Sequence, residues 1–362
     1  MQHTTTSVAS GRKQTITGGL TFLAMIGGGL VVGAQDASII PDRPAGVEQY
    51  NLVWDSPSED YNGSMPIGNG DLAANMWVEP SGDLLFYLSK SDAWSARHDL
   101  LKLGRVRVTM DPPLVEEGTT FRQELDLASG SIRITASSPA RKRAIRFWID
   151  ANRPVVHVEI ESDEPASAAV TLESWRAEGK WLMWDAERDV ILPTDGETIR
   201  WYQRNTKSIF KETMKTQHLS HMVDRMTDPL MDLTFGGLIA GEGLTARDDK
   251  TLATTQPLNR MHLRVHALTE QTETPEAWVE KIDRQRAVAE AVPRDESWQA
   301  HERWWNAFWD RSYIYLYGTE EAETVAQAYQ LQRWVMAGAG RGTFPIKFNG
   351  SLFTGDGVAD YH

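Results

Sequence analysis

The 362-residue sequence contains no cysteine, which excludes a disulfide framework, a thiolate metal site and a cysteine nucleophile. Basic residues are also scarce: 37 lysines and arginines stand against 50 aspartates and glutamates, so the formal net charge is −13. A nucleic-acid partner is not expected, because phosphate binding needs a basic face that releases counterions. The 41% hydrophobic content with 24% charged residues excludes a disordered chain, and the length suits about two domains.

The N-terminal segment has the pattern of an export signal. Two basic residues precede an apolar run over residues 16–32, and small residues at its end fit a cleavage site before Gln35. We expect residues 1–34 to be removed, and the mature protein to be secreted or periplasmic. An uncleaved membrane anchor is the alternative, because the run approaches spanning length. No second apolar stretch of that length follows in the sequence, so no span is expected after removal of the signal.

From about residue 47 to residue 272 the hydrophobic pattern has a period of two. Apolar and polar residues alternate over strand lengths, and turn-forming residues separate the segments. The expected strands are 83–89, 104–110, 131–135, 143–149, 154–160, 168–174 and 261–267. Because no helical pattern lies between them, they predict a large antiparallel β-sandwich rather than βαβ units.

The hydrophobic period changes to that of a helix at about residue 274. Helices are expected over 274–293, 295–311 and 319–336. The third helix has a set of residues that share one face: Val325, Ala328, Tyr329, Gln332 and Val335. Since the sequence supplies no element of comparable size to cover this face, we expect it to be exposed and to favour self-association.

These patterns divide the chain into four parts. The expected parts are a signal peptide (1–34), an N-terminal β-sandwich domain (47–272), a helical linker (274–316) and a final helical segment (317–362). The fold class is therefore mainly β with a C-terminal helical segment.

Several stretches resemble a known group of glycoside hydrolases. The motif Pro-Ile-Gly-Asn-Gly-Asp at 66–71 resembles the opening of glycoside hydrolase family 95 proteins. The runs 87–95 and 101–108 are closer to a bacterial sister family, an uncharacterised domain numbered 5703. Within 301–351, tryptophan-rich and glycine-rich segments are similar to the helical linker and first barrel helix of that clan.

The resemblance implies a β-sandwich, a helical linker and the start of an (α/α)6 barrel that holds the active site. It implies the N-terminal portion of an exported glycoside hydrolase-like protein that acts on a glycan. The clan's inverting chemistry needs a positioned acid and a positioned water, and the resemblance places both groups downstream of this sequence. No catalytic residue is therefore carried over, and the chain alone is expected to be inactive. The loop 345–351 departs from the family 95 pattern, so fucoside specificity is not carried over either.

Two other functions stay open at this point. The chain is alternatively a non-catalytic carbohydrate-binding β-sandwich, or an interaction domain of an exported assembly. The carboxylates Glu159, Glu161 and Glu173 lie in strand patterns and are expected to face solvent rather than to form a catalytic pair.

The loop after the third helix supplies candidate substrate-binding residues. Arg341, Lys347 and Asn349 carry guanidinium, ammonium and amide groups that can hold sugar hydroxyls or a carboxylate. The alternative is a loop whose polar groups satisfy the end of the helix. Trp94 is a candidate platform for a pyranose face, with core packing as its alternative. The same two interpretations apply to three more tryptophans of the sandwich, Trp181, Trp184 and Trp201. The tryptophans of the linker are expected to pack between the two domains: Trp298, Trp304, Trp305 and Trp309.

No metal or cofactor motif stands out. Asp60, Asn62 and Asp71 fit Asx turns better than a calcium loop, and His218 and His221 have no third ligand at a suitable spacing. The sequence also contains no P-loop, dinucleotide-binding glycine motif or serine nucleophile elbow. We therefore expect neither a metal nor a cofactor.

Overall fold

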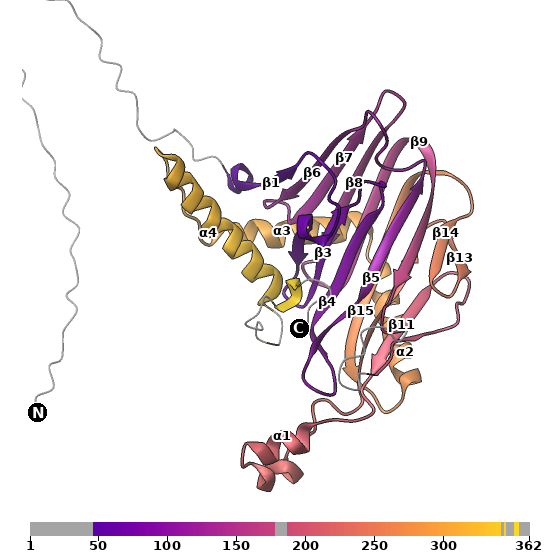
Figure 1. Ribbon diagram of the computed structural model, residues 1–362, viewed down its shortest axis with the longest axis vertical. Helices are drawn as coiled ribbons and strands as arrows, with labels where there is room; N and C mark the ends of the chain where they lie inside the picture. Colours follow the sequence, from indigo (N-terminus) through magenta and orange to yellow (C-terminus); the bar gives the residue numbers. More distant parts are fainter. Residues whose placement is uncertain (1–45, 178–186, 342–343, 345–350, 355–362) are drawn as a thin grey trace, which may run out of the picture. The chain divides into compact units, whose positions relative to one another are not determined.

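The computed structural model of the chain describes residues 46–177, 187–341, 344 and 351–354 (Figure 1). The expected signal segment (1–34) lies outside this part of the chain. So do two candidate tryptophans, Trp181 and Trp184, and two candidate loop residues, Lys347 and Asn349. No helix in the described ranges is both long and apolar enough to cross a membrane.

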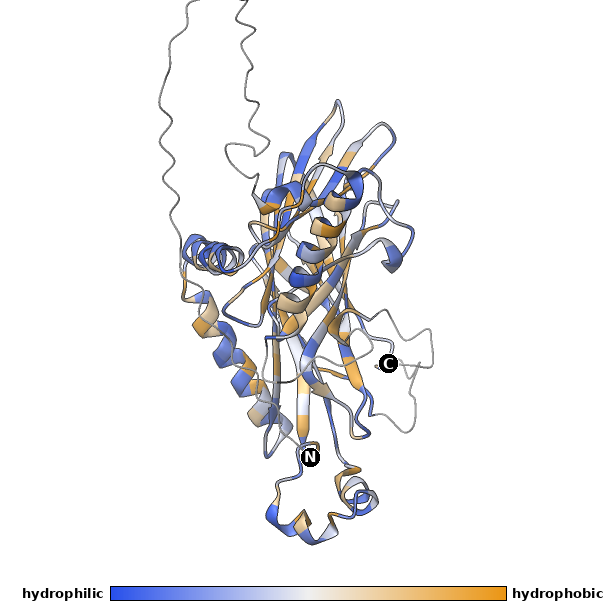
Figure 2. Ribbon diagram, turned by 90° about the vertical axis from the view of Figure 1, so that its left-hand side faces the viewer, coloured by the Kyte–Doolittle hydropathy of each residue, from blue (hydrophilic) through white to orange (hydrophobic). Residues whose placement is uncertain are grey.

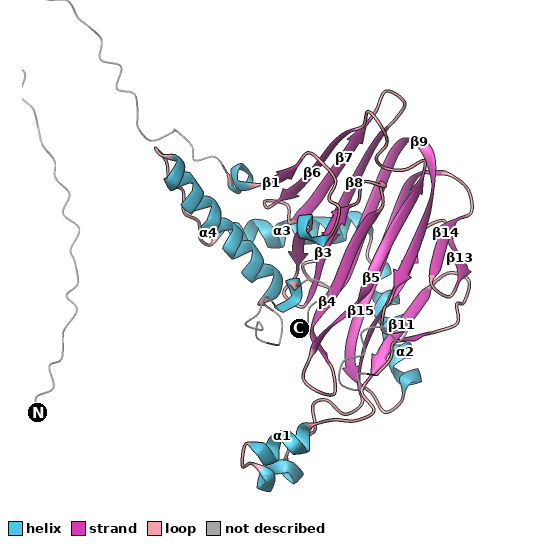
Figure 3. Ribbon diagram, viewed as in Figure 1, coloured by secondary structure: helices cyan, strands magenta, loops and turns pink. Residues whose placement is uncertain are grey.

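The described part is built mainly from strands, with the longer helices at its C-terminal end (Figure 3). The strands are β1 (Leu52–Trp54), β2 (Met65–Gly68), β3 (Leu72–Val78), β4 (Leu84–Trp94), β5 (Leu100–Asp111), β6 (Thr120–Asp126), β7 (Ser131–Ser137), β8 (Lys142–Ile149), β9 (Val155–Glu173), β10 (Val190–Ile191), β11 (Ile199–Arg204), β12 (Leu233–Gly241), β13 (Leu244–Asp248), β14 (Thr251–Thr254) and β15 (Leu258–Gln271). The α-helices are α1 (Phe210–Thr216), α2 (Pro275–Glu290), α3 (Arg294–Asp310) and α4 (Glu320–Ala339).

The strands pair antiparallel in two sheets. Sheet A has the order β1-β6-β7-β8-β9-β15-β12-β11-β10, and sheet B has the order β2-β3-β4-β5-β9-β14-β13. Strand β9 belongs to both: its first half pairs with β8 and β15, and its second half pairs with β5 and β14. The separate strands expected at 154–160 and 168–174 were therefore wrong. The polar run at 162–164 interrupts the alternation, but the backbone continues through it as the strand passes from one sheet to the other.

The two sheets pack face to face around one main hydrophobic core. This core takes buried side chains from both sheets, and Phe86 of β4 meets Phe147 of β8 with ring centroids 5.0 Å apart. Figure 2 shows hydrophobic and hydrophilic residues mixed along the strands, as the period of two requires. The prediction of an antiparallel β-sandwich followed by helices is confirmed. The (α/α)6 barrel is not confirmed. The short helix α1, between β11 and β12, was not expected.

Helices α2 and α3 cover the outer face of sheet A. Helix α2 begins at the expected Thr274 cap, whose hydroxyl accepts a hydrogen bond from the Ala277 amide at 3.2 Å. It buries Trp278 against Tyr202 and Leu238 of the sheet. The expected packing of the linker tryptophans is confirmed: Trp305 and Trp309 join the main core, Trp304 packs against it, and Trp298 contacts Trp148 of the sandwich.

Helix α4 is seated on the motif at 66–71. The Trp334 indole donates to the Pro66 carbonyl at 2.9 Å, and the Gly70 amide donates to the Gly338 carbonyl at 2.8 Å. A Cβ on Gly68 would lie 2.4 Å from the Gly338 carbonyl oxygen, so only glycine permits this approach. The motif's glycines therefore set how close the end of α4 comes to the sandwich.

The opposite face of α4 is exposed, as the sequence predicted. Val325 is 58% exposed, Val335 36% and Met336 53%. Ala326 and Trp334, on the other side of the helix, are buried. Eight of the fourteen exposed large hydrophobic side chains in the described part of the chain lie between residues 313 and 344. The exposed apolar surface is therefore concentrated around α4 and the segment before it.

Candidate functional site

An open cavity of about 530 Å³ lies where α3 and α4 meet. It is lined by two aromatic rings, three arginines and two smaller apolar side chains: Trp304, Phe308, Arg311, Arg333, Met336, Ala337 and Arg341. We call it the arginine–aromatic cavity. Its volume falls in the range of small-molecule sites, roughly 300–1,000 Å³.

Helical spacing places these residues on facing sides of the two helices. Trp304, Phe308 and Arg311 follow steps of four and three along α3 and its C-terminal cap. Along α4 and the residues after it, Arg333 precedes Ala337 by four residues, and Arg341 follows Ala337 by four. The cavity is thus lined by one stripe from each helix.

Arg341 is fixed by contacts from three sides. Its guanidinium carbon lies 3.5 Å from the Trp304 ring centroid, and its Nη2 donates to the Ala151 carbonyl at 3.0 Å. Its Nε is buried and has no hydrogen-bond partner within the described part of the chain. On the third side lies Gly70, at φ +87°, where a Cβ would come within 2.0 Å of the Arg341 Cγ. The motif at 66–71 therefore positions this arginine as well as the helix.

Asn69 of the same motif fixes the loop that carries the Ala151 carbonyl. Its side-chain amide donates to the carbonyls of Asp150 and Arg153 at 2.8 and 2.9 Å. Its oxygen accepts from the amides of Asp71 and Leu72 at 3.0 and 2.8 Å. The loop after β8 and the start of β3 are thereby joined, so the acceptor of Arg341 has a defined place.

The other two arginines are held by rings and carbonyls rather than by acids. Arg333 donates to the carbonyls of Ser312 and Phe308, and its guanidinium lies 4.6 Å from the Phe308 centroid. The Arg311 guanidinium lies 5.4 Å from the same centroid. Within the described residues, none of the three guanidinium groups forms an ion pair with a carboxylate.

Like charge and burial make this an unfavourable place for cations. Burial and, second, the positive charge of Arg311 lower the pKa of Arg341 to about 10, and Asp150 partly opposes them. Burial and Arg311 also lower the pKa of Arg333. All three groups remain charged at neutral pH, so the cavity has a positive potential that a bound anion would relieve.

The arrangement can hold a ligand with both a ring and an oxyanion. A guanidinium stacked on an aromatic ring keeps its in-plane N–H donors available, and these match a carboxylate or sulfate bidentately. The rings themselves offer surface for the C–H face of a sugar. Among the described residues that line the cavity there is no carboxylate or imidazole, and the guanidinium groups present are suited to binding an oxyanion.

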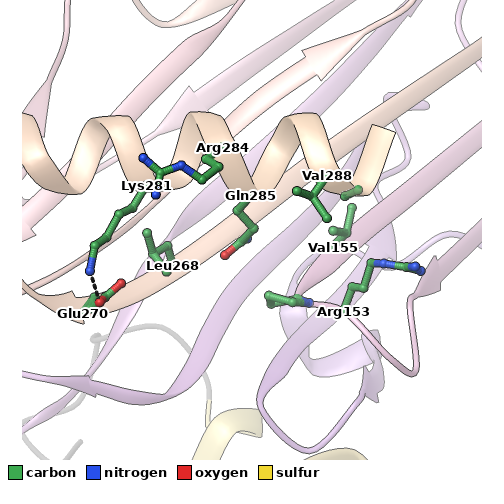
Figure 4. Close-up of a pocket in the computed structure, with 10 residues that line it drawn as sticks. Arg153, Val155, Leu268, Glu270, Lys281, Arg284, Gln285 and Val288 are labelled. Carbon is green, nitrogen blue, oxygen red and sulfur yellow. Dashed lines mark hydrogen bonds and ion pairs between the residues drawn. The ribbon is translucent and has the colours of Figure 1, made fainter. Parts of the chain in front are cut away.

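A second cavity, of about 470 Å³, lies between α2 and the strands β9 and β15 (Figure 4). Its polar groups are largely engaged: Lys281 pairs with Glu270, and the Gln285 amide donates to the Ala267 carbonyl at 3.0 Å. Figure 4 shows the Lys281–Glu270 pair at the rim and Leu268 beside it. This cavity has an apolar floor and few free polar groups, and it ranks behind the first as a candidate site.

Buried histidines lie under the helices that cover sheet A. His157 and His262 contact each other at 2.9 Å, and His301 accepts from the Ala151 amide at 3.1 Å. Burial lowers the pKa of His262 and of His301 to about 4, and that of His157 well below its usual value. The space beside His157, His262 and His266 is only about 10 Å³, so no substrate fits there. In the described ranges no three His, Asp or Glu side chains are grouped to hold a metal.

The structure places two of the four predicted site residues. Arg341 lines the arginine–aromatic cavity, and it donates to a loop of the sandwich rather than to the end of its own helix. Trp94 lies half-buried at the end of β4, where its indole donates to the Ser91 carbonyl at 3.1 Å and its ring packs against the main core. Lys347 and Asn349 lie outside the described residues. The roles of all four remain predictions.

Two further expectations are corrected by the structure. Trp201 is 1% exposed and its indole donates to the Leu103 carbonyl at 2.6 Å, so it is a core residue and not a sugar platform. Glu159 does not face solvent. It is buried and accepts hydrogen bonds from the Trp148 indole at 2.8 Å and from Arg146 at 2.5 Å.

The remaining cavity residues were missed by the sequence reasoning. Trp304 packs against the main core, as expected, and it also lines the cavity. That second role, and the positions of Arg311 and Arg333 beside it, did not follow from the sequence. The sequence does show that aromatic and arginine residues share one face on each of the two helices. This spacing does not determine which faces of the two helices meet; the structure shows that these two faces do.

Comparison with known proteins identifies the family. The model for the N-terminal part of the domain of unknown function DUF5703 matches residues 53–314. The chain belongs to this family. The match runs from the second residue of β1 to residue 314 and includes α2 and α3, and therefore three of the cavity residues. No curated protein matches the chain.

Two solved structures share a distant likeness. One is named as a candidate kojibiose phosphorylase from the human microbiome: TM-score 0.47, 12% identity, covering 82% of this chain and 43% of that one. The other is a bacterial glucoamylase in complex with acarbose: TM-score 0.38, 6% identity, covering 80% and 44%. The chain thus spans less than half the length of either protein. At these scores the likeness carries no argument about function.

Proposed function

We propose that the chain is the N-terminal portion of an exported, glycoside hydrolase-like protein, and that it contacts a glycan in the arginine–aromatic cavity. The relation to glycoside hydrolase family 95 and the continuation into an (α/α)6 barrel belong to the same proposal. Catalytic acid and base groups are assigned to other parts of the whole protein. The chain's own contribution is to bind and orient sugar.

The convergence of rings and guanidinium groups around one open cavity is the observation that supports this proposal. Trp304 and Phe308 stack with an interplanar angle of 13°, and three arginines surround them. Ring surface with a few strong hydrogen-bond donors suits sugars, which have apolar C–H faces and polar edges. A surface that only packs apolar side chains does not require three guanidinium groups, none of which forms an ion pair with a carboxylate of the described residues.

Carbohydrate binding by the chain from residue 35 tests the proposal. Glycan-array screening followed by calorimetry should find a ligand, and Trp304→Leu should weaken its binding about tenfold or more. The matched control is Tyr317→Ala, which removes an aromatic ring that is 47% exposed and does not line the cavity. Equal loss of binding in both variants, or no carbohydrate binding by the unaltered chain, would contradict the proposal.

A hydrolysis assay separates binding from catalysis. The chain alone should not hydrolyse aryl glycosides, because the described residues that line the cavity include no carboxylate or imidazole to act as acid or base. Turnover that is abolished by substituting one of the sandwich's own carboxylates would instead place an active site on the sandwich. Binding without turnover is also what a non-catalytic carbohydrate-binding sandwich would give, and assay of a longer protein distinguishes the two.

A further inference from the structure

We infer that the ligand of the arginine–aromatic cavity is an anionic sugar, with a uronate carboxylate or a sulfate ester directed at Arg311, Arg333 and Arg341. This inference rests on the proposed function, because it specifies the sugar that the same cavity binds. It narrows the candidate ligands of the cavity from sugars in general to sugars that carry an oxyanion.

The first argument is the absence of an internal counter-ion. Elsewhere in the described part of the chain, most arginines with little exposure pair with acids, as Arg176 does with Asp189 at 3.0 Å, whereas Arg143 is held by the Pro112 and Pro113 carbonyls. The formal net charge is −13, so carboxylates are abundant. The cavity differs in that three guanidinium groups lie close together and none forms an ion pair within the described residues, so a ligand oxyanion would supply a counter-charge to all three.

The second argument is the number of donors left for a ligand. Arg341 uses Nη2 for the Ala151 carbonyl and has a buried Nε without a partner. Arg311 contacts the Phe308 ring and makes no hydrogen bond among the described residues. The exposed Arg311 therefore has N–H donors open to a ligand, and a charge-assisted hydrogen bond to an oxyanion is stronger than one to a hydroxyl, so an oxyanion is favoured.

The third argument is the arrangement of rings and charges. Arg341 stacks on Trp304 and Arg333 stacks on Phe308, and these two rings stack on each other at 5.5 Å. The two stacked guanidinium groups are thereby held by aromatic surface rather than by acids. A pyranose carrying one oxyanion fits such a cavity, because its ring meets apolar surface such as Met336 while its charged substituent meets the arginines.

Binding of matched charged and neutral sugars tests the inference. The probes are trigalacturonate, its methyl ester as the neutral counterpart, a sulfated disaccharide, and inorganic sulfate alone. Isothermal calorimetry on the chain from residue 35 should show the methyl ester about tenfold weaker than the free acid, and binding of the acid should weaken with added salt. The uronate and the sulfated probe distinguish the two sources of the oxyanion.

Arg311→Gln is the informative variant, because its side chain is exposed and bonds to nothing that holds the fold. It should weaken the charged probe about fivefold and leave the neutral probe unchanged. The matched control Arg303→Gln removes an exposed arginine of the same helix that does not line the cavity, and should leave both probes unchanged.

The outcomes separate this inference from the function on which it rests. No binding of any sugar, charged or neutral, overturns the proposed function. Equal binding of acid and ester, insensitive to Arg311→Gln, overturns the anionic class and leaves the glycan proposal standing. Inorganic sulfate that binds as tightly as the sugars overturns the sugar part and reduces the cavity to an anion site.

Discussion

The arginines of the sandwich and those of the arginine–aromatic cavity are held in opposite ways. On sheet B, Arg107 pairs with Glu79, Asp83 and Glu173 at 2.7–2.8 Å. In the cavity, the described neighbours of the guanidinium groups are rings, carbonyls and each other. In the sandwich most of the half-buried arginines pair with acids, with Arg143 as an exception, whereas the three cavity arginines have no carboxylate partner among the described residues and could bind an anion.

The difference follows from how each region is built. Cross-strand neighbours lie about 5 Å apart at fixed positions, so an arginine on one strand meets an acid on the next at a predictable place. Two helices meet along side chains that neither helix specifies alone. Stability experiments should therefore separate the two regions more sharply than any other measurement.

Arg176→Leu should have the largest effect on folding. It leaves Asp189, whose side chain is 2% exposed, as a buried charge without its partner. Removing one member of a buried pair costs about 3–5 kcal/mol of unfolding free energy. Urea denaturation followed by tryptophan fluorescence measures this cost.

Arg311→Gln is the comparison, and it should change the unfolding free energy by less than about 0.5 kcal/mol, because it removes an exposed cation and some repulsion. Equal losses in the two variants would erase the contrast.

Lowering the pH should also weaken the sandwich. Burial lowers the pKa of His301 and of His262 to about 4, so the unfolded chain binds protons near pH 6.5 that the folded chain excludes. Unfolding free energy should therefore fall as pH drops from about 6.5 to about 4, by about 3 kcal/mol for His301 alone. Denaturation midpoints between pH 7.5 and pH 4.5 measure the slope.

His301→Gln should make that slope shallower, because glutamine can accept from the Ala151 amide without titrating. The exposed His221 supplies the control: His221→Gln should leave the slope unchanged. A slope that is identical in the unaltered chain and in His301→Gln would show that this buried imidazole does not contribute.

The contrast between the regions also explains what the sequence could predict. The sandwich and the three C-terminal helices follow from hydrophobic periods, which are local and which the structure confirms at 131–137 and 275–290. The continuous strand β9 could not be predicted, because its polar middle reads locally as a break. It continues because a strand that passes between sheets pairs with different partners on each side.

The candidate site was only partly predictable. Arg341 was found because it follows the glycine-rich end of a helix, a position typical of loops that carry function. Trp304 was assigned to packing because a tryptophan beside Trp305 gives no sign of which ring faces the core. Trp305 is 1% exposed and Trp304 is half-buried at the cavity, a difference that depends on where α4 lies.

Gly68→Ala should displace α4 with a moderate effect on folding. Its Cβ would lie 2.4 Å from the Gly338 carbonyl oxygen, which belongs to backbone and cannot rotate away. Overpacking of this kind costs about 1–3 kcal/mol. Because α4 carries Arg333 and precedes Arg341, binding of the charged sugar should weaken as well.

The control is Gly118→Ala, where a Cβ meets nothing within 4 Å but φ is +80°, so that it reports backbone strain alone. Unchanged sugar binding in Gly68→Ala would mean that the motif does not position the cavity.

Val335→Lys should have the smallest effect on folding and a clear effect on association. Val335 is 36% exposed, and Val325 and Met336 extend the apolar surface along α4. Such a surface favours contact between copies of the chain, and a lysine on it opposes that contact at little cost to a side chain already in water. Sedimentation velocity at a concentration on the order of 100 µM should show self-association of the unaltered chain and a shift toward monomer in the variant.

The matched control is Val190→Lys on β10. This valine is 41% exposed and lies away from α4, so the substitution should leave association unchanged. A monomeric unaltered chain, or equal shifts in both variants, would show that the exposed face of α4 is not a contact surface, and would leave the unpaired arginines as the feature that sets this region apart from the sandwich.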